Sequence, residues 1–151
     1  MSVRPFIQAY KSDGTKPLMD ALTGYNTLAS GSTYYFELTG PRDLLCSAHL
    51  QWDSAIILTS VVMEDTNLPG SVASAYSSTA GNWLTENPTT AYIPVTGAGV
   101  TVSNATVAAT GGAAGACMIN IADQGSYRQR IKVVVAGTGG LLRCAVWNKG
   151  Q

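Results

Sequence analysis

A row of cations near the end of the chain is the first feature that could take part in binding. In YRQRIKVVVAGTGGLLRCAVWNKGQ, residues 127–151, the cations are Arg128, Arg130, Lys132, Arg143 and Lys149. The stretch has the pattern of two strands around a glycine-rich turn. Alternate residues of a strand share a face, so the row predicts either a contact with acidic groups of a neighbouring subunit or a solvated sheet face.

The same stretch predicts a register if its two strands pair as a hairpin. The expected inner-face pairs are Ile131 with Cys144, Val133 with Leu142, and Gln129 with Val146. The expected outer-face pairs are Arg130 with Ala145, Lys132 with Arg143, and Arg128 with Trp147. Lys132 and Arg143 would repel each other unless an acidic group lay between them, whereas Arg128 over Trp147 would form a cation–π pair. The candidate partner contacts on this face are therefore Arg128, Arg130, Lys132, Arg143 and Trp147.

Residue patterns typical of catalysis are sparse. The single histidine, His49, lies on the polar parity of an expected strand, which favours a solvated or interface position. Glu64 and Asp65 are the densest acidic pair, but the further oxygen ligands of a calcium site are missing. No nucleophile elbow, P-loop or HExxH motif occurs, and GTGG at 137–140 precedes a strand pattern rather than a helix. We expect no enzyme activity, no catalytic or metal-binding residues and no cofactor.

Trp83 has two interpretations. It lies in the polar stretch STAGNWLTENP, within the Ser/Thr/Ala/Gly-rich segment 73–87 that we expect to form a long surface loop. An exposed tryptophan on such a loop would be an anchor for a partner protein or a glycan. A tryptophan that folds back would instead cover the open end of the fold, because this side chain is largely buried in most proteins. Trp83 therefore joins the candidate partner contacts.

The composition limits the partners. Nine basic and nine acidic residues give a formal net charge of zero, and charged residues make up 12% of the 151. A balanced charge gives no electrostatic footprint for nucleic acid, and it favours association with other proteins. The cysteines, Cys46, Cys117 and Cys144, lie in apolar runs with no CxxC pair, so we expect reduced, buried thiols in a protein assembled in a reducing cytoplasm. No apolar run is long enough to predict a transmembrane helix.

Short β-rich segments separated by Gly, Pro, Asn and Ser dominate the chain. The expected strands are Val3–Tyr10, Ser32–Leu38, Leu45–Trp52, Ala55–Glu64, Ala91–Val95, Val100–Ala108, Ala116–Ile121, Tyr127–Val135 and Leu141–Trp147. Leu45–Trp52 alternates between apolar and polar residues, whereas AIILTSVVM at 55–63 is apolar on both parities and should be a central or interface strand. Eight to nine short strands predict an all-β, single antiparallel β-sandwich that is jelly-roll-like and spans residues 1–151 as one domain.

Two N-terminal segments remain open. Residues 1–10, MSVRPFIQAY, are expected to form either an arm that reaches a neighbour or an edge strand of the same sandwich. PLMDAL at 17–22 has proline at its first position and Gly24 beyond its end, which is compatible with a short helix and equally with an extended segment.

Three segments in order resemble a known class of proteins. HLQWDSAIILTSVVMEDTNLPG is followed by a Gly-Asn-Trp loop at 81–83, and the chain closes with GSYRQRIKVVVAGTGGLLRCAVWNKGQ. Residues 45–151 thus resemble the small β-sandwich virion structural proteins of tailed bacteriophages, of the capsid decoration or cement type. The resemblance lies in the order of the segments, and residues 1–44 add nothing to it.

The resemblance implies a non-enzymatic virion protein, assembled in the host cytoplasm, that binds the assembled head and stabilises it. It implies the major capsid protein or other virion proteins as partners, and a homo-oligomer, with a trimer favoured. An alternative is a tail- or fibre-associated module that binds a host-surface glycan or receptor through Trp83. Neither reading involves a membrane, and neither favours nucleic acid.

Overall fold

A computed structural model describes residues 6–38, 45–86, 93–120 and 128–148, and every structural statement below refers to these residues. They contain no helix, and hence none long and apolar enough to cross a membrane. They form twelve strands: β1 (Tyr10–Lys11), β2 (Asn26–Leu28), β3 (Thr33–Glu37), β4 (Leu45–Trp52), β5 (Leu58–Thr66), β6 (Leu84–Thr85), β7 (Val95–Thr96), β8 (Val100–Ser103), β9 (Thr106–Ala109), β10 (Gly115–Asn120), β11 (Arg128–Val135) and β12 (Gly140–Asn148). The all-β prediction is confirmed.

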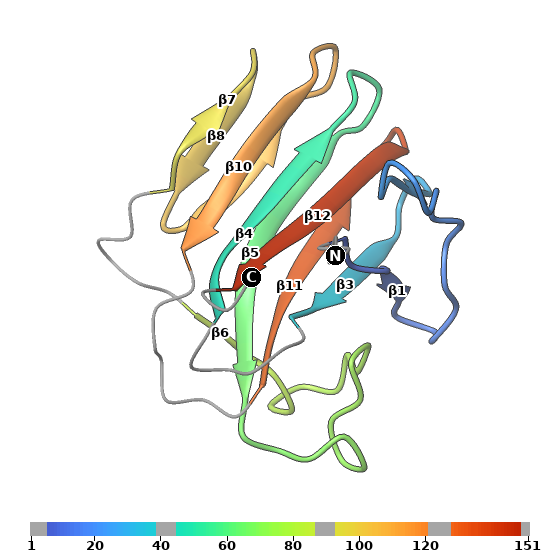
Figure 1. Ribbon diagram of the computed structural model, residues 1–151, viewed down its shortest axis with the longest axis vertical. Helices are drawn as coiled ribbons and strands as arrows, with labels where there is room; N and C mark the ends of the chain where they lie inside the picture. The colour runs from blue at the N-terminus through green and yellow to red at the C-terminus, as the bar shows by residue number, and fades with distance from the viewer. Residues whose placement is uncertain (1–5, 39–44, 87–92, 121–127, 149–151) are drawn as a thin grey trace.

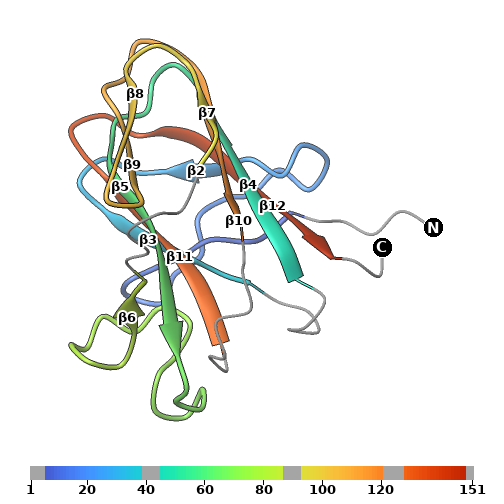
Figure 2. The ribbon, with the colours of Figure 1, turned by 90° about the vertical axis from the view of Figure 1, so that its left-hand side faces the viewer.

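The strands form two antiparallel sheets that pack as a sandwich (Figures 1 and 2). The seven-stranded sheet has the order β1-β3-β11-β5-β9-β8, with β6 also paired to β5, and the five-stranded sheet has the order β2-β12-β4-β10-β7. The nine expected segments become twelve strands because two short strands, β2 and β6, lie outside the expected segments. In addition, one expected strand at 100–108 is broken into β8 and β9.

The strand order is that of a jelly roll. From β2 to β5 consecutive strands alternate between the two sheets, and from β9 to β12 they alternate again on the way back. The returning strands insert beside the outgoing ones, which gives the four-strand cores β2-β12-β4-β10 and β3-β11-β5-β9. This double wrapping places the two last strands, β11 and β12, inside opposite sheets.

The apolar parity of each long strand faces the space between the sheets. Ala48, Leu50 and Trp52 of β4 are at most 2% exposed, whereas His49, on the opposite parity, is exposed. Strand β5 lies between β11 and β9, as its run of apolar residues predicts for a central strand. Each fully buried Leu, Val, Ile or Phe side chain stabilises the fold by about 1.5–3 kcal/mol. The core therefore follows from the alternation of the sequence.

The predicted hairpin between the last two strands is wrong. Ile131 of β11 lies opposite Met63 and Phe36, and Cys144 of β12 lies opposite Leu50, so the two strands belong to different sheets. The predicted inner parity is nevertheless right, because Gln129, Ile131, Val133, Leu142, Cys144 and Val146 are all buried. Strands that face each other across a sandwich have the same parity pattern as strands of a hairpin, so parity alone does not separate the two arrangements.

The glycines of GTGG let the chain cross from one sheet to the other. A Cβ atom on Gly139 would lie 2.3 Å from the backbone oxygen of Leu28 and 3.0 Å from the backbone nitrogen of Ser30. The connection is held by backbone hydrogen bonds from Ile57 to Thr138 and from Ala136 to Ile57. Only glycine lets two backbones approach this closely, so here it permits a crossing between layers rather than a hairpin turn.

The N-terminal segment, residues 6–11, closes one side of the sandwich. Phe6 forms a bridge with Ala145 of the five-stranded sheet, and Tyr10 pairs with Tyr35 of the seven-stranded sheet. Between them Ala9 is fully buried, and its N–H donates to the side-chain oxygen of Asn26. The edge-strand alternative is therefore the arrangement of residues 6–11, whereas residues 1–5 of the expected arm lie outside the described residues.

The segment at 17–22 is extended and turning rather than helical. Met19 forms an antiparallel bridge with Asn26, and the carboxylate of Asp20 accepts hydrogen bonds from the backbone N–H groups of Leu22 and Thr23. In the expected helix Asp20 would lie in the interior, where aspartate is a poor helix former. In the structure its side chain instead stabilises a turn. The hydrogen bonds from the backbone N–H groups of Leu22 and Thr23 also lower the pKa of the Asp20 carboxyl, because they stabilise its charged form.

The turn between β8 and β9 contains a strained alanine. Asn104 and Ala105 both have positive φ, at 49° and 58°, as a two-residue hairpin turn requires. Replacing Ala105 by glycine should therefore raise the free energy of unfolding by about 0.5–1 kcal/mol, because glycine adopts this conformation without the clash of a Cβ atom. Chemical denaturation measures the difference. The same change at Ala108, in β9, should lower stability by a similar amount, and a loss at both positions would contradict the strain.

Candidate functional site

Three of the six predicted contact residues come together on the outer face of the seven-stranded sheet. Arg130 of β11 lies between Glu37 of β3 and Glu64 of β5 in the strand register. Its Nε donates to Glu64 Oε1 at 2.8 Å, and the two side chains are 2% and 7% exposed. Arg130 is thus a buried charge with a buried partner, not a surface cation.

The guanidinium of Arg130 is sandwiched between two aromatic rings. It lies 3.8 Å from the centre of the Tyr35 ring and 4.3 Å from the centre of the Trp83 ring. Burial lowers the pKa of Arg130, and the nearby Glu64 carboxylate opposes that shift. Burial likewise raises the pKa of the Tyr35 hydroxyl. A planar cation between two π faces is stabilised electrostatically where water is excluded.

Arg128 extends this cluster toward solvent. Its Nε donates to Glu37 Oε1 at 2.8 Å, and its guanidinium lies 5.0 Å from the centre of the Trp83 ring. Its Nη1 donates to the backbone oxygens of Leu68 and Ala73. We call the five side chains the clasp: Glu37, Glu64, Trp83, Arg128 and Arg130.

We call residues 67–86 the flap; this segment follows β5 and includes β6 (Figure 2), and side chains of the clasp bind it. Arg130 Nη1 donates to the backbone oxygen of Ala75, and Trp83 Nε1 donates to that of Ser74 at 3.0 Å. At the far side of the sheet the ring of Tyr76 stacks on Tyr10 of β1, with 6.0 Å between the ring centres. The arginines thus donate hydrogen bonds to backbone carbonyl groups of the flap that lie outside the strands.

The folded-back interpretation of Trp83 agrees with the structure, since this residue is 6% exposed. It covers the outer face of a sheet, however, and not an open end of the sandwich. What the flap exposes instead is Val72 at 57%, Leu84 at 65% and Tyr76 at 36%. The clasp therefore binds one part of the flap, while Val72 and Leu84 stay exposed for contact.

The other three predicted contact residues do not join the clasp. Lys132 lies further along β11 on the same outer face, half-buried and opposite Tyr35 and Val62. Arg143 and Trp147 lie on the outer face of the other sheet. Trp147 is 54% exposed there, and no contact joins it to Arg128 among the described residues. The predicted Arg128–Trp147 and Lys132–Arg143 pairs are therefore wrong, because their strands belong to different sheets.

Arg143 anchors the N-terminal side of the five-stranded sheet. Its Nε donates to Gln51 Oε1 at 2.8 Å, and its guanidinium lies 4.6 Å from the Tyr25 ring centre and 5.8 Å from the Phe6 ring centre. A Cβ atom on Gly24 would lie 2.2 Å from the Phe6 ring, so this glycine makes room for the ring. The guanidinium of Arg143 is therefore engaged by groups of the same chain, and it is only partly exposed to a partner.

Glu37 and Glu64 are the acidic partners of the arginines, whereas the sequence pattern predicts acidic groups from a neighbouring subunit. Both acids belong to the same chain, on strands far from β11 in sequence. The carboxylate of Glu64 is committed to Arg130 and is not free to form a metal site with Asp65. The described residues contain no group of three or more His, Cys, Asp or Glu side chains that could hold a metal ion.

The thiols of Cys117 and Cys144 are free and buried, as predicted. Burial raises the pKa of Cys117 to about 12 and that of Cys144 further, so both remain protonated and unreactive at neutral pH. The side chain of Cys46 lies outside the described residues.

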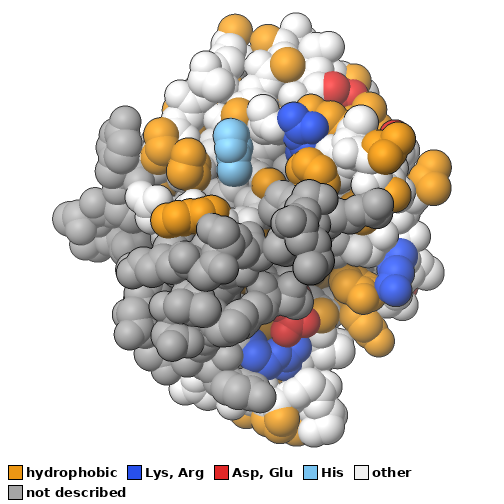
Figure 3. All heavy atoms as spheres, in the orientation of Figure 1, with side chains coloured by type: hydrophobic (Ala, Val, Ile, Leu, Met, Phe, Trp, Pro, Cys, Tyr) orange, Lys and Arg blue, Asp and Glu red, His pale blue; other side chains and the backbone are white. Residues whose placement is uncertain are grey.

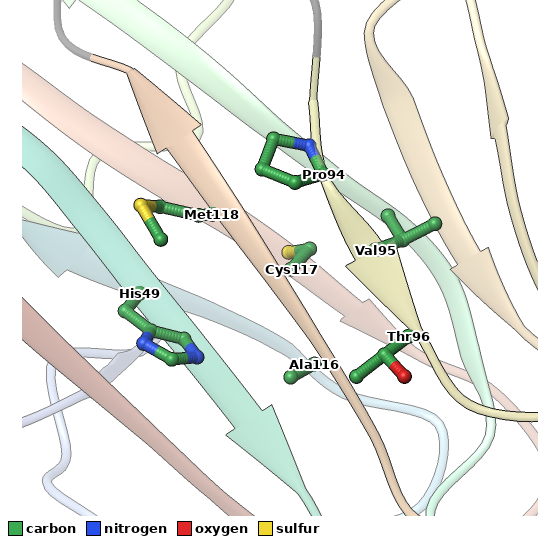
Figure 4. A pocket seen from close by; sticks show the side chains of 7 residues that line it. All are labelled: His49, Pro94, Val95, Thr96, Ala116, Cys117 and Met118. Carbon is green, nitrogen blue, oxygen red and sulfur yellow. The ribbon is translucent and has the colours of Figure 1, made fainter.

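A shallow hollow of about 180 Å³ marks the outer face of the five-stranded sheet (Figures 3 and 4). Its walls come from three adjacent strands and are mostly apolar: His49, Pro94, Val95, Thr96, Ala116, Cys117 and Met118. In Figure 3 the pale-blue His49 is bordered by hydrophobic side chains. The other titratable group in these walls is the buried thiol of Cys117, which burial keeps protonated, so the imidazole has no partner for acid–base catalysis and the hollow fits an apolar contact better.

A pair of carboxyl groups at the base of the flap makes stability depend on pH. Burial and the nearby Asp65 raise the pKa of Glu86 to about 7, and the two side chains share a hydrogen bond. A carboxyl whose pKa is raised by folding binds a proton more tightly in the folded state. The free energy of unfolding should therefore fall as the pH rises from about 4.5 to about 7.

The variant Glu86→Gln should remove this dependence. At pH 8 we expect it to be more stable than the wild type by about 1–2 kcal/mol, a value reduced to allow for solvent screening of a half-buried group. Below pH about 4 the two proteins should differ little, because Glu86 is then protonated in both the folded and the unfolded states. Urea denaturation at several pH values measures the difference. Parallel stability profiles of the two proteins would contradict the shared proton.

Comparisons with known proteins add no relative: no protein-family model, no curated protein and no solved structure matches this chain.

Proposed function

We propose that this chain is a non-enzymatic virion structural protein that binds the assembled head of a tailed bacteriophage and stabilises it, as a capsid decoration or cement protein. One observation carries the binding part of the proposal. The flap exposes Val72, Leu84 and Tyr76, while the clasp holds its inner side by a buried ion pair. A surface whose shape is set before binding loses little conformational freedom when a partner docks.

The identity of the partner rests on the resemblance of residues 45–151 to small β-sandwich virion proteins. In this proposal the major capsid protein, or another virion protein, contacts the flap. The jelly-roll sandwich is compatible with such a role, but this fold also serves many other functions and does not by itself assign one.

Purified particles test the proposal. Mass spectrometry should find the chain at a high copy number that matches a symmetry site of the head. The variants Val72→Lys and Leu84→Lys should lower its occupancy on particles at least about tenfold, because a lysine must lose its hydration to enter an apolar contact. Leu18→Lys is the matched control, since Leu18 is 79% exposed beside the other sheet and should retain full occupancy. Absence of the chain from particles would overturn the proposal.

The alternative is a tail- or fibre-associated module that binds a host-surface glycan or receptor. Trp83 is too buried to offer a ring face to a sugar, but Trp147 is 54% exposed on the outer face of the five-stranded sheet. Loss of glycan or cell binding in a folded Trp147→Ala variant, together with location on the tail, would favour this alternative over the head.

A further inference from the structure

The two lateral sides of the sandwich differ. On one side the N-terminal segment runs from β12 in one sheet to β3 in the other and covers the gap. On the opposite side the sheets end in β7 and β8, which the short connection 97–99 joins (Figures 1 and 2). No described strand follows β7 in its sheet or β8 in its own.

Two valines on this side have the parity of core residues but remain partly exposed. Val102 of β8 lies opposite Val107, which is fully buried, and Val95 of β7 lies opposite Cys117, which is 2% exposed. Val95 and Val102 are nevertheless each 39% exposed. Both lie at the margin of the core, where one further strand on the edge of each sheet would cover them.

The backbone of β8 is also available. Strands β8 and β9 are joined by a two-residue turn, so Ser103 and Thr106 form the hydrogen-bonded pair that closes the hairpin. Val102 and Val107 are the next pair, which is of the non-hydrogen-bonded kind. The N–H and C=O of Val102 therefore point away from β9 toward the open edge. An edge with outward donors and acceptors is a template for another strand.

The strands on this side carry no charged side chain. Residues 93–120, which contain β7, β8, β9 and β10, include no Asp, Glu, Lys, Arg or His. Natural proteins usually protect such edges with charged side chains, and β7 and β8 have none. A partner that placed a charge against this surface would have to desolvate it without an opposite charge to meet it. The partner surface must therefore also be uncharged, and the same side of a second copy satisfies that condition.

We propose that the β7–β8 side is a self-association surface, at which β8 of one copy pairs antiparallel with β8 of a second copy about a twofold axis. Such a contact is isologous, which means that both copies contribute the same residues, including Val102. It joins the two seven-stranded sheets edge to edge and covers the exposed Val102. The inference stands on this side alone and does not depend on the proposed capsid contact of the flap, which lies on another surface.

Sedimentation equilibrium of the full chain tests the inference. The pairing involves short strands and a small area, so we expect a reversible dimer with a dissociation constant of about 1–100 µM. Val102→Pro removes an N–H group that β9 does not use, and Val102→Lys brings two like charges together at the axis. Each should weaken the dimer at least about tenfold.

Val72→Lys is the control, because it adds the same charge at a 57% exposed position on the flap and should leave the dimer unchanged. Thermal unfolding within about 3 °C of the wild type shows that a variant is folded. A wild type that is a monomer at about 1 mM, or a trimer, would overturn the inference, as would dimers that both Val102 variants leave intact. Occupancy on particles is a separate measurement, so failure of the capsid proposal would be recognised independently.

Discussion

Replacing Arg130 by alanine is expected to lower the free energy of unfolding by about 3–5 kcal/mol, because it leaves the buried carboxylate of Glu64 without its partner. The ion pair is almost fully withdrawn from water, at 2% and 7% exposure of its side chains. The change also removes the cation between Tyr35 and Trp83 and the donor to the backbone oxygen of Ala75. Urea denaturation measures the loss of stability.

A double variant separates the ion pair from simple loss of packing. Arg130→Met with Glu64→Met removes both charges and keeps apolar volume, so it should recover most of the stability that Arg130→Ala loses. In Arg130→Ala alone, amide hydrogen exchange in the flap should accelerate more than exchange in β4 of the other sheet.

Arg143→Ala is the matched control for this experiment. Arg143 also packs near aromatic rings, but it is half-buried and bonds to the neutral Gln51, so its loss should cost about 1 kcal/mol. Equal losses from Arg130→Ala and Arg143→Ala would contradict the assignment of a buried charge pair to the clasp.

Replacing Asn26 by alanine is expected to lower the free energy of unfolding by about 2–3 kcal/mol, because this fully buried amide joins the N-terminal segment to the sandwich. Its oxygen accepts hydrogen bonds from Ala9 N–H and from the Gln8 amide, at 3.0 and 3.1 Å. Its nitrogen donates to the backbone oxygens of Ile7, Gly24 and Leu142. The variant leaves the buried N–H of Ala9 without an acceptor, and denaturation should detect the loss.

The neighbouring position provides the control. Thr27 belongs to the same strand, β2, but is exposed, so Thr27→Ala should change stability by no more than about 0.5 kcal/mol. Asn26→Asp keeps an acceptor for Ala9 and loses the donor to the carbonyl groups, so it too should be less stable than the wild type. An Asn26→Ala protein as stable as the Thr27→Ala protein would refute the role of this amide.

The sequence predicted which face of each long strand is buried, since alternation reports this directly. In β11 and β12 the predicted inner residues are all buried. The partner strands were not predictable from the same signal. Parity is the same for a hairpin and for two strands stacked across a sandwich, and nothing local to GTGG shows that Gly139 must pass beside the backbone at Leu28.

Only part of the clasp could be predicted from the sequence. The alternation of Arg128 and Arg130 placed them on one outer face, as the structure has them. Their acids were missed because Glu37 and Glu64 belong to strands that lie far away in sequence. Only the strand order β3-β11-β5 brings them to either side of the arginines. The burial of Trp83 could not be predicted because its neighbours in sequence are polar. In the structure its ring is covered by the guanidinium groups of Arg128 and Arg130, which lie far away in sequence.

The positions of β11 and β12 have a consequence for how the chain acquires its structure. Each is the last strand of its sheet to be synthesised, yet each lies between earlier strands: β11 between β3 and β5, and β12 between β2 and β4. Before residue 128 leaves the ribosome, neither pair of neighbours has its shared partner. Both sheets must then close through contacts between residues distant in sequence, which is slow. We therefore expect folding to follow synthesis, with a slow phase in which the nascent chain needs protection from aggregation.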